Sequence, residues 1–64
     1  MIELVKTDNR LRLHFLKSML EDAGLHPIVV EASSYPGVLP MRLIVPDDEG
    51  PLARRVVAEA ERDL

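Results

Sequence analysis

The chain has 64 residues with no cysteine, 30% charged residues and a formal net charge of −3 at pH 7. This length fits a single domain over residues 1–64, and the lack of cysteine excludes disulfides and cysteine-ligated zinc. The acidic balance argues against nucleic acid or membrane as a partner, since both attract clustered Lys and Arg, and without a predicted membrane span or signal peptide we expect a cytoplasmic protein.

The first predicted element is a strand over residues 2–6. Residues in a strand alternate between its two faces, so Ile2 and Leu4 are expected on one face and Glu3 and Val5 on the other.

A helix is predicted over residues 10–23. Any of residues 7–9, Thr-Asp-Asn, can cap its start, and Gly24 supplies the left-handed position that ends it. Helical spacing places Leu13 at the edge of the apolar arc. The arc itself is expected to contain Leu11, Phe15, Leu16, Met19, Leu20 and Ala23.

A second strand is predicted over residues 26–32, with Ile28 and Val30 on one face and Val29 and Glu31 on the other. A turn-rich connection follows it, since residues 33–39 contain a Ser-Ser pair and a Pro-Gly pair.

A third strand is predicted over residues 41–45, between two prolines, with Arg42 and Ile44 sharing one face. The acidic residues 47–49 and Pro51 then indicate the start of a helix that runs from about residue 48 to the end. Its apolar arc is expected to contain Leu52, Val56, Val57, Ala60 and Leu64.

The element order β-α-β-β-α predicts an α+β fold. The third strand returns antiparallel between the first two, which gives a three-stranded sheet of order 1-3-2 with both helices on one face. This is a ferredoxin-like split β-α-β arrangement.

Two stretches resemble a known bacterial family. They are FLxSMLExAGL over residues 15–25 and LPxRLxVP over residues 39–46, and in this order they resemble the prokaryotic family of putative signal-transducing proteins over nearly the whole chain. The resemblance implies a fold related to the PII signal proteins. Those proteins bind nucleotides through a long loop between strands two and three, whereas the connection at residues 33–39 is short and has no Lys or Arg.

The remaining polar residues predict no catalytic, cofactor or metal site. His14 and His26 are expected to be separate solvated histidines, and the acidic residues 47–49 to cap a helix. No activated nucleophile or acid–base pair occurs at a recognisable spacing. Tyr35, the aromatic residue of the connecting loop, is either a binding residue or a cap on the core edge.

The sheet face away from the helices is the candidate interaction surface. Arg42 on the central strand is expected to lie between Glu3 and Glu31 as a cross-strand charge ladder. Beside it, an apolar strip is expected to remain uncovered, and the first strand forms an unpaired edge. These features indicate either a partner that covers them or a small monomer whose open face is solvated. The predicted surface residues are Val5, Val29, Tyr35, Arg42 and Ile44.

These features favour a non-enzymatic regulatory or protein-interaction domain, whose partner is another protein or a second copy of the chain. The alternative is a sensor of a small ligand or nucleotide that acts as a homo-oligomer. The sequence does not identify the ligand of such a sensor.

Overall fold

The computed structural model describes residues 1–31 and 40–62. They form an α+β fold with the predicted order β-α-β-β-α and a short 3-10 turn before the last helix. The elements are β1 (Ile2–Thr7), α1 (Arg10–Asp22), β2 (Ile28–Glu31), β3 (Met41–Val45), η1 (Asp47–Glu49) and α2 (Gly50–Arg62).

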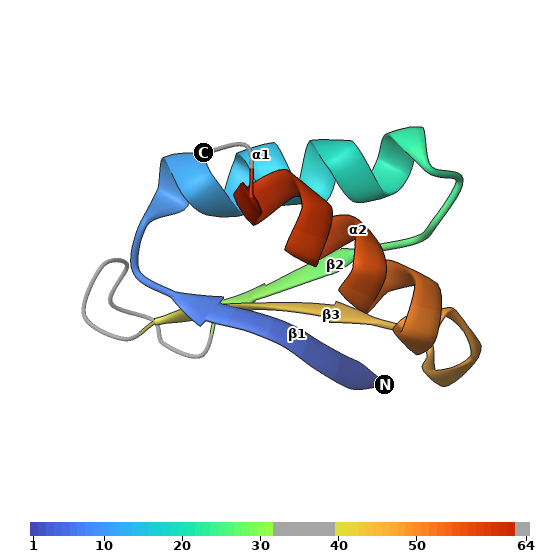
Figure 1. The fold of residues 1–64 in the computed structure, drawn as a ribbon. Helices are drawn as coiled ribbons and strands as arrows, with labels where there is room; N and C mark the ends of the chain where they lie inside the picture. Colours follow the sequence, from blue (N-terminus) through green and yellow to red (C-terminus); the bar gives the residue numbers. More distant parts are fainter. Residues whose placement is uncertain (32–39, 63–64) are drawn as a thin grey trace.

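The sheet has the predicted order β1-β3-β2, and β3 pairs antiparallel with both neighbours. Both helices cover one face of it, so the fold has two layers, as Figure 1 shows. The predicted fold class is therefore confirmed. Within the described residues, neither helix has the length and apolar character required to cross a membrane.

The ends of α1 follow local rules that the sequence displays. The side chain of Asn9 accepts a hydrogen bond from the Arg12 backbone N–H at 3.1 Å, which caps the first turn. At the other end, Gly24 adopts φ +83°. The Gly24 N–H donates to the Glu21 carbonyl at 3.0 Å and the Leu25 N–H to the Leu20 carbonyl at 3.1 Å. This is a Schellman motif, which satisfies the last carbonyls of the helix.

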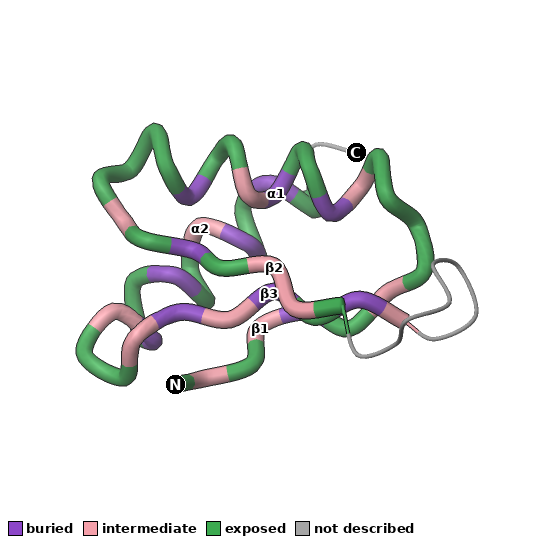
Figure 2. The backbone as a smooth tube through the Cα atoms, turned by 180° about the vertical axis from the view of Figure 1, so that it is seen from behind, coloured by how far each residue is buried: buried purple, intermediate pink, exposed green. Residues whose placement is uncertain are grey.

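The core lies between the sheet and the helices and consists of hydrophobic, almost entirely aliphatic residues. Figure 2 marks the buried segments of the backbone. The central strand β3 contributes three buried residues, which are Met41, Leu43 and Val45. The small residues Ala53 and Ala60 are buried on α2, and they allow this helix to approach the sheet and α1 closely. The buried residues of the core are Val5, Leu13, Leu16, Leu20, Met41, Leu43, Val45, Ala53, Val57 and Ala60.

The start of α2 depends on a close approach at Gly50. This residue is buried, and a Cβ atom added there would collide with the Cδ1 atom of Ile2. Pro51 is the second residue of the helix, within the first turn as predicted. Proline is tolerated there because the N–H groups of the first turn have no acceptor inside the helix.

The predicted buried face of α1 is partly wrong. Leu13, expected at the edge of the arc, is 1% exposed, whereas Leu11, expected inside it, is 84% exposed. Phe15 and Met19 are also exposed, at 40% and 37%. Two apolar stripes share this helix, and the one at i, i+3 and i+7 (Leu13, Leu16, Leu20) faces the sheet.

The predicted buried face of α2 needs a smaller correction. Val57 and Ala60 are buried as expected, but Leu52 is exposed and Ala53 takes its place in the core. Leu64 lies outside the described residues.

Candidate functional site

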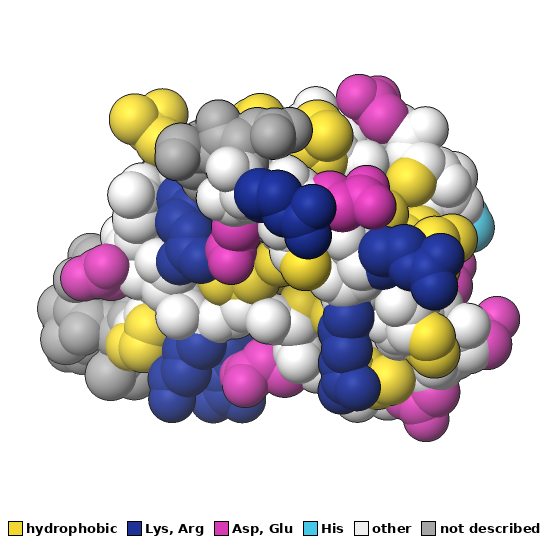
Figure 3. All heavy atoms as spheres, in the orientation of Figure 1, with side chains coloured by type: hydrophobic (Ala, Val, Ile, Leu, Met, Phe, Trp, Pro, Cys, Tyr) yellow, Lys and Arg dark blue, Asp and Glu magenta, His cyan; other side chains and the backbone are white. Residues whose placement is uncertain are grey.

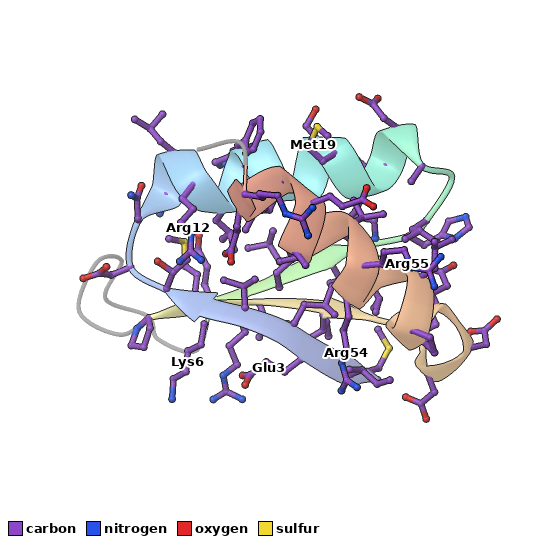
Figure 4. The ribbon with its side chains drawn as sticks, in the orientation of Figure 1. Glu3, Lys6, Arg12, Met19, Arg54 and Arg55 are labelled. Carbon is purple, nitrogen blue, oxygen red and sulfur yellow. The ribbon has the colours of Figure 1, made fainter. Side chains whose placement is uncertain are left out.

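The face of the sheet opposite the helices is left uncovered by the described residues. Directly opposite residues of an antiparallel pair share a face, so the strand registers identify which side chains lie there. We call this surface the open face, and it consists of Glu3, Lys6, Ile28, Val30, Arg42 and Ile44. Figure 4 shows Glu3 and Lys6 pointing away from the helices on this side.

Two of the predicted surface residues lie on the other face. Val5 is opposite Leu43 and is 9% exposed, and Val29 is also opposite Leu43 and packs against the core. In β1 the cause is a bulge, because the register shifts between Glu3 and Val5 and the alternation restarts after it. In β2 the residues from Ile28 to Val30 are all apolar, so the sequence did not determine which of them face the core.

Arg42 and Ile44 lie on the open face as predicted. Of the predicted charge ladder, the contact of Arg42 with Glu3 is present and the contact with Glu31 is not. Arg42 Nε lies 3.7 Å from Glu3 Oε1. Glu31, however, is opposite Met41 on the helix side, where its carboxylate lies 3.3 Å from Arg10 of α1. Tyr35, the other predicted surface residue, lies outside the described residues.

The open face carries a local positive charge. Lys6 is directly opposite Arg42 in the register, and Glu3 is the acidic residue beside them. Two cations and one carboxylate give a net charge of +1 for this face, in a chain whose formal net charge is −3. Like charges directly opposite each other are unfavourable in a sheet, so a carboxylate supplied from outside would be stabilised here.

An apolar strip adjoins these charges. Ile28 is opposite Ile44 and is 47% exposed, and Val30 lies opposite Arg42. Aliphatic side chains beside an arginine are typical of protein-binding surfaces, where Arg is enriched and apolar contacts exclude water.

A second exposed apolar stripe lies on α1. It contains Leu11, Phe15 and Met19 at intervals of four residues, and Figure 4 shows Met19 on the side of the helix away from the sheet. Helical spacing alone predicts these residues in the core, so the exposed stripe was not predicted from the sequence. The spacing of Leu13, Leu16 and Leu20 was the signal that a second apolar face was present.

His26 and Glu49 form an interaction that was not predicted from the sequence. The two oxygens of the Glu49 carboxylate accept hydrogen bonds from the His26 backbone N–H at 2.8 Å and from its ring Nδ1 at 2.6 Å. The ring hydrogen bond and the negative charge of Glu49 raise the pKa of His26 above its usual 6.5. The bonds from the ring and the backbone lower the pKa of Glu49 below its usual 4.5. The pair therefore ties the entry of β2 to the 3-10 turn as an ion pair at mildly acidic pH.

The other acidic residues of this region have structural partners or face solvent. Asp47 Oδ1 lies 2.6 Å from the amino group of Met1, and Asp48 is exposed. Among the residues that the structure describes, no three His, Asp or Glu side chains are grouped so that they could hold a metal ion.

The sequence matches the model of one protein family over residues 1–61, and the description of that family is "Putative prokaryotic signal transducing protein". The chain belongs to this family. This match confirms the resemblance found in the sequence, and the family description names signal transduction in general terms only. No significant match was found among curated proteins or among solved structures.

Proposed function

We propose that this domain is a non-enzymatic regulatory module of the bacterial cytoplasm that binds another protein through the open face of its sheet. The observation that carries the proposal is the combination on one uncovered surface of an apolar strip, Ile28 and Ile44, with the opposed cations Lys6 and Arg42. The family description supports a role in signalling. The chemistry of the surface favours a partner that presents apolar side chains next to a carboxylate.

A photo-crosslinking experiment with a matched control tests this proposal. The photoreactive residue p-benzoylphenylalanine replaces Ile28 in one variant and Leu52 of α2 in another. These two apolar side chains have nearly equal exposure, 47% and 46%, but Leu52 does not belong to the open face. Each variant is produced in the prokaryote that carries the native gene, and the cells are irradiated.

The expected result is a discrete crosslinked species from the Ile28 position and none from the Leu52 position. Reversal of the charge in Arg42→Glu, combined with the crosslinker at position 28, should reduce the yield because an acidic partner is then repelled. Equal crosslinking at both positions, or none at position 28, would contradict the proposal.

A further inference from the structure

The outer edge of β1 is open in the described part of the chain. In the order β1-β3-β2, β1 has a strand on one side only, and Figure 1 shows it in front of β3 with its other side free of any described strand. Such an edge presents backbone N–H and C=O groups that can pair with a further strand.

The bulge in β1 changes which side chains share a face along this edge. Glu3 is opposite Ile44 and Lys6 is opposite Arg42, and Arg42 and Ile44 lie two residues apart on the same face of β3. Residues three apart in a regular strand would point to opposite faces. Because of the extra residue between Glu3 and Val5, the Glu3 and Lys6 side chains both lie on the open face.

We propose that β1 pairs antiparallel with β1 of a second copy of this chain, about a twofold axis, so that Glu3 of each copy lies opposite Lys6 of the other. In the register that overlaps all six residues of the strand, Ile2 also meets Thr7, and Leu4 meets Val5. Each of these pairs is matched in face. Ile2 and Thr7 are opposite the core residues Val45 and Met41, and Leu4 and Val5 both pack in the core.

Charge and shape together select a second copy as the occupant of this edge. The register with the greatest overlap is also the one that places each carboxylate opposite an ammonium group, and opposite charges in cross-strand pairs are stabilising. A bulged strand carries one extra residue, so its register with a regular strand is interrupted at the bulge. A second copy has the same bulge at the symmetry-related position, so the two irregularities coincide.

The resulting assembly would be a six-stranded sheet whose two open faces are continuous across the twofold axis. Figure 3 has the orientation of Figure 1, with β1 toward the viewer, and basic and acidic side chains are interspersed on this view of the molecule. The contact involves one six-residue strand from each copy. It therefore buries much less surface than the ~1,600 Å² of a standard interface. We therefore expect a weak and concentration-dependent dimer.

Charge reversal with rescue by mixing tests the pairing. Glu3→Lys and Lys6→Glu each create two like-charge pairs across the axis, and each should weaken dimerisation by on the order of tenfold. A mixture of the two single variants should form a heterodimer, because the two ammonium groups of the Glu3→Lys chain then meet the two carboxylates of the Lys6→Glu chain. The double variant with both substitutions should dimerise like the wild type.

The measurement is the solution mass by sedimentation equilibrium from about 10 µM to 1 mM, a range that spans weak association. Circular dichroism of each variant verifies that the monomer is folded. The proposal is overturned if the wild type stays a monomer at the highest concentration, if the single variants dimerise as the wild type does, or if their mixture remains monomeric. None of these outcomes alters the crosslinking test at Ile28, so this proposal and the proposed function can fail separately.

Discussion

Two leucines of α1 should differ strongly in how much stability is lost when each is replaced by alanine. Leu13 is 1% exposed and Leu11 is 84% exposed, although both are the same residue type on the same helix. Truncation of a fully buried leucine costs about 2–5 kcal/mol, since it leaves a cavity and exposes apolar surface. At about 0.05–0.15 kcal/mol per residue, a domain of this length has a total stability of roughly 3–10 kcal/mol. Leu13→Ala should therefore remove a large part of the stability, whereas Leu11→Ala should change it by less than about 0.5 kcal/mol.

Urea unfolding followed by circular dichroism measures both free energies. If Leu13→Ala is too unstable to give a folded baseline, Leu13→Val provides a milder test, with an expected loss of about 1 kcal/mol for one methylene group. Leu11→Val is its control, since it carries the same cost of a β-branched residue in a helix. Equal losses at the two positions, or a larger loss at Leu11, would refute the orientation of α1 described above.

Three further predictions concern the helix ends and the histidine pair. Asn9→Ala should lower the free energy of unfolding by about 1 kcal/mol, measured by urea titration, because the first turn of α1 loses its side-chain cap; Asn9→Ser should recover most of this loss. Gly24→Ala should cost about 1–2 kcal/mol in the same assay, since φ is +83° and the cost is one of backbone conformation, with no atom within 4 Å of the added Cβ. The His26–Glu49 pair should stabilise the fold most between pH 4.5 and 6.5. The raised pKa of His26 makes its contribution disappear as the pH rises through the folded-state value, and the lowered pKa of Glu49 makes its contribution disappear as the pH falls through its own. The stability difference between wild type and Glu49→Gln should therefore be larger at about pH 5.5 than at about pH 8, and a difference that is constant with pH would count against this ion pair.

Local signals determined the element order, and for this reason it could be predicted. Asn9 caps the start of α1 and Gly24 ends the helix, and both act through local backbone geometry that depends on few neighbours. The strand β3 also matched its prediction in bounds and in faces. Its alternation was unambiguous because Arg42 interrupts an otherwise apolar run. A three-stranded order then followed from connection lengths and the antiparallel return of β3.

The faces of the other elements depend on tertiary contacts, which the local pattern does not contain. In β2 the run from Ile28 to Val30 is apolar at every position, so only its register with β3 decides that Val29 faces the core. In α1 both apolar stripes satisfy helical spacing, and the docking of the helix against the sheet selects one of them. The hydrogen bonds between His26 and Glu49 connect residues 23 positions apart, and no sequence motif marks them.

The bulge in β1 links the main error of prediction to the main proposal about assembly. The single extra residue moves Val5 from the expected open face into the core and brings Lys6 to the face that carries Glu3. An apolar position of the expected surface is thereby replaced by a cation opposite Arg42, which changes the charge of the open face. The same shift gives the edge of β1 a carboxylate and an ammonium group on one face, three residues apart. A strand with this pattern is complementary to a second copy that runs antiparallel to it. Without the bulge, the same sequence would place Glu3 and Lys6 on opposite faces.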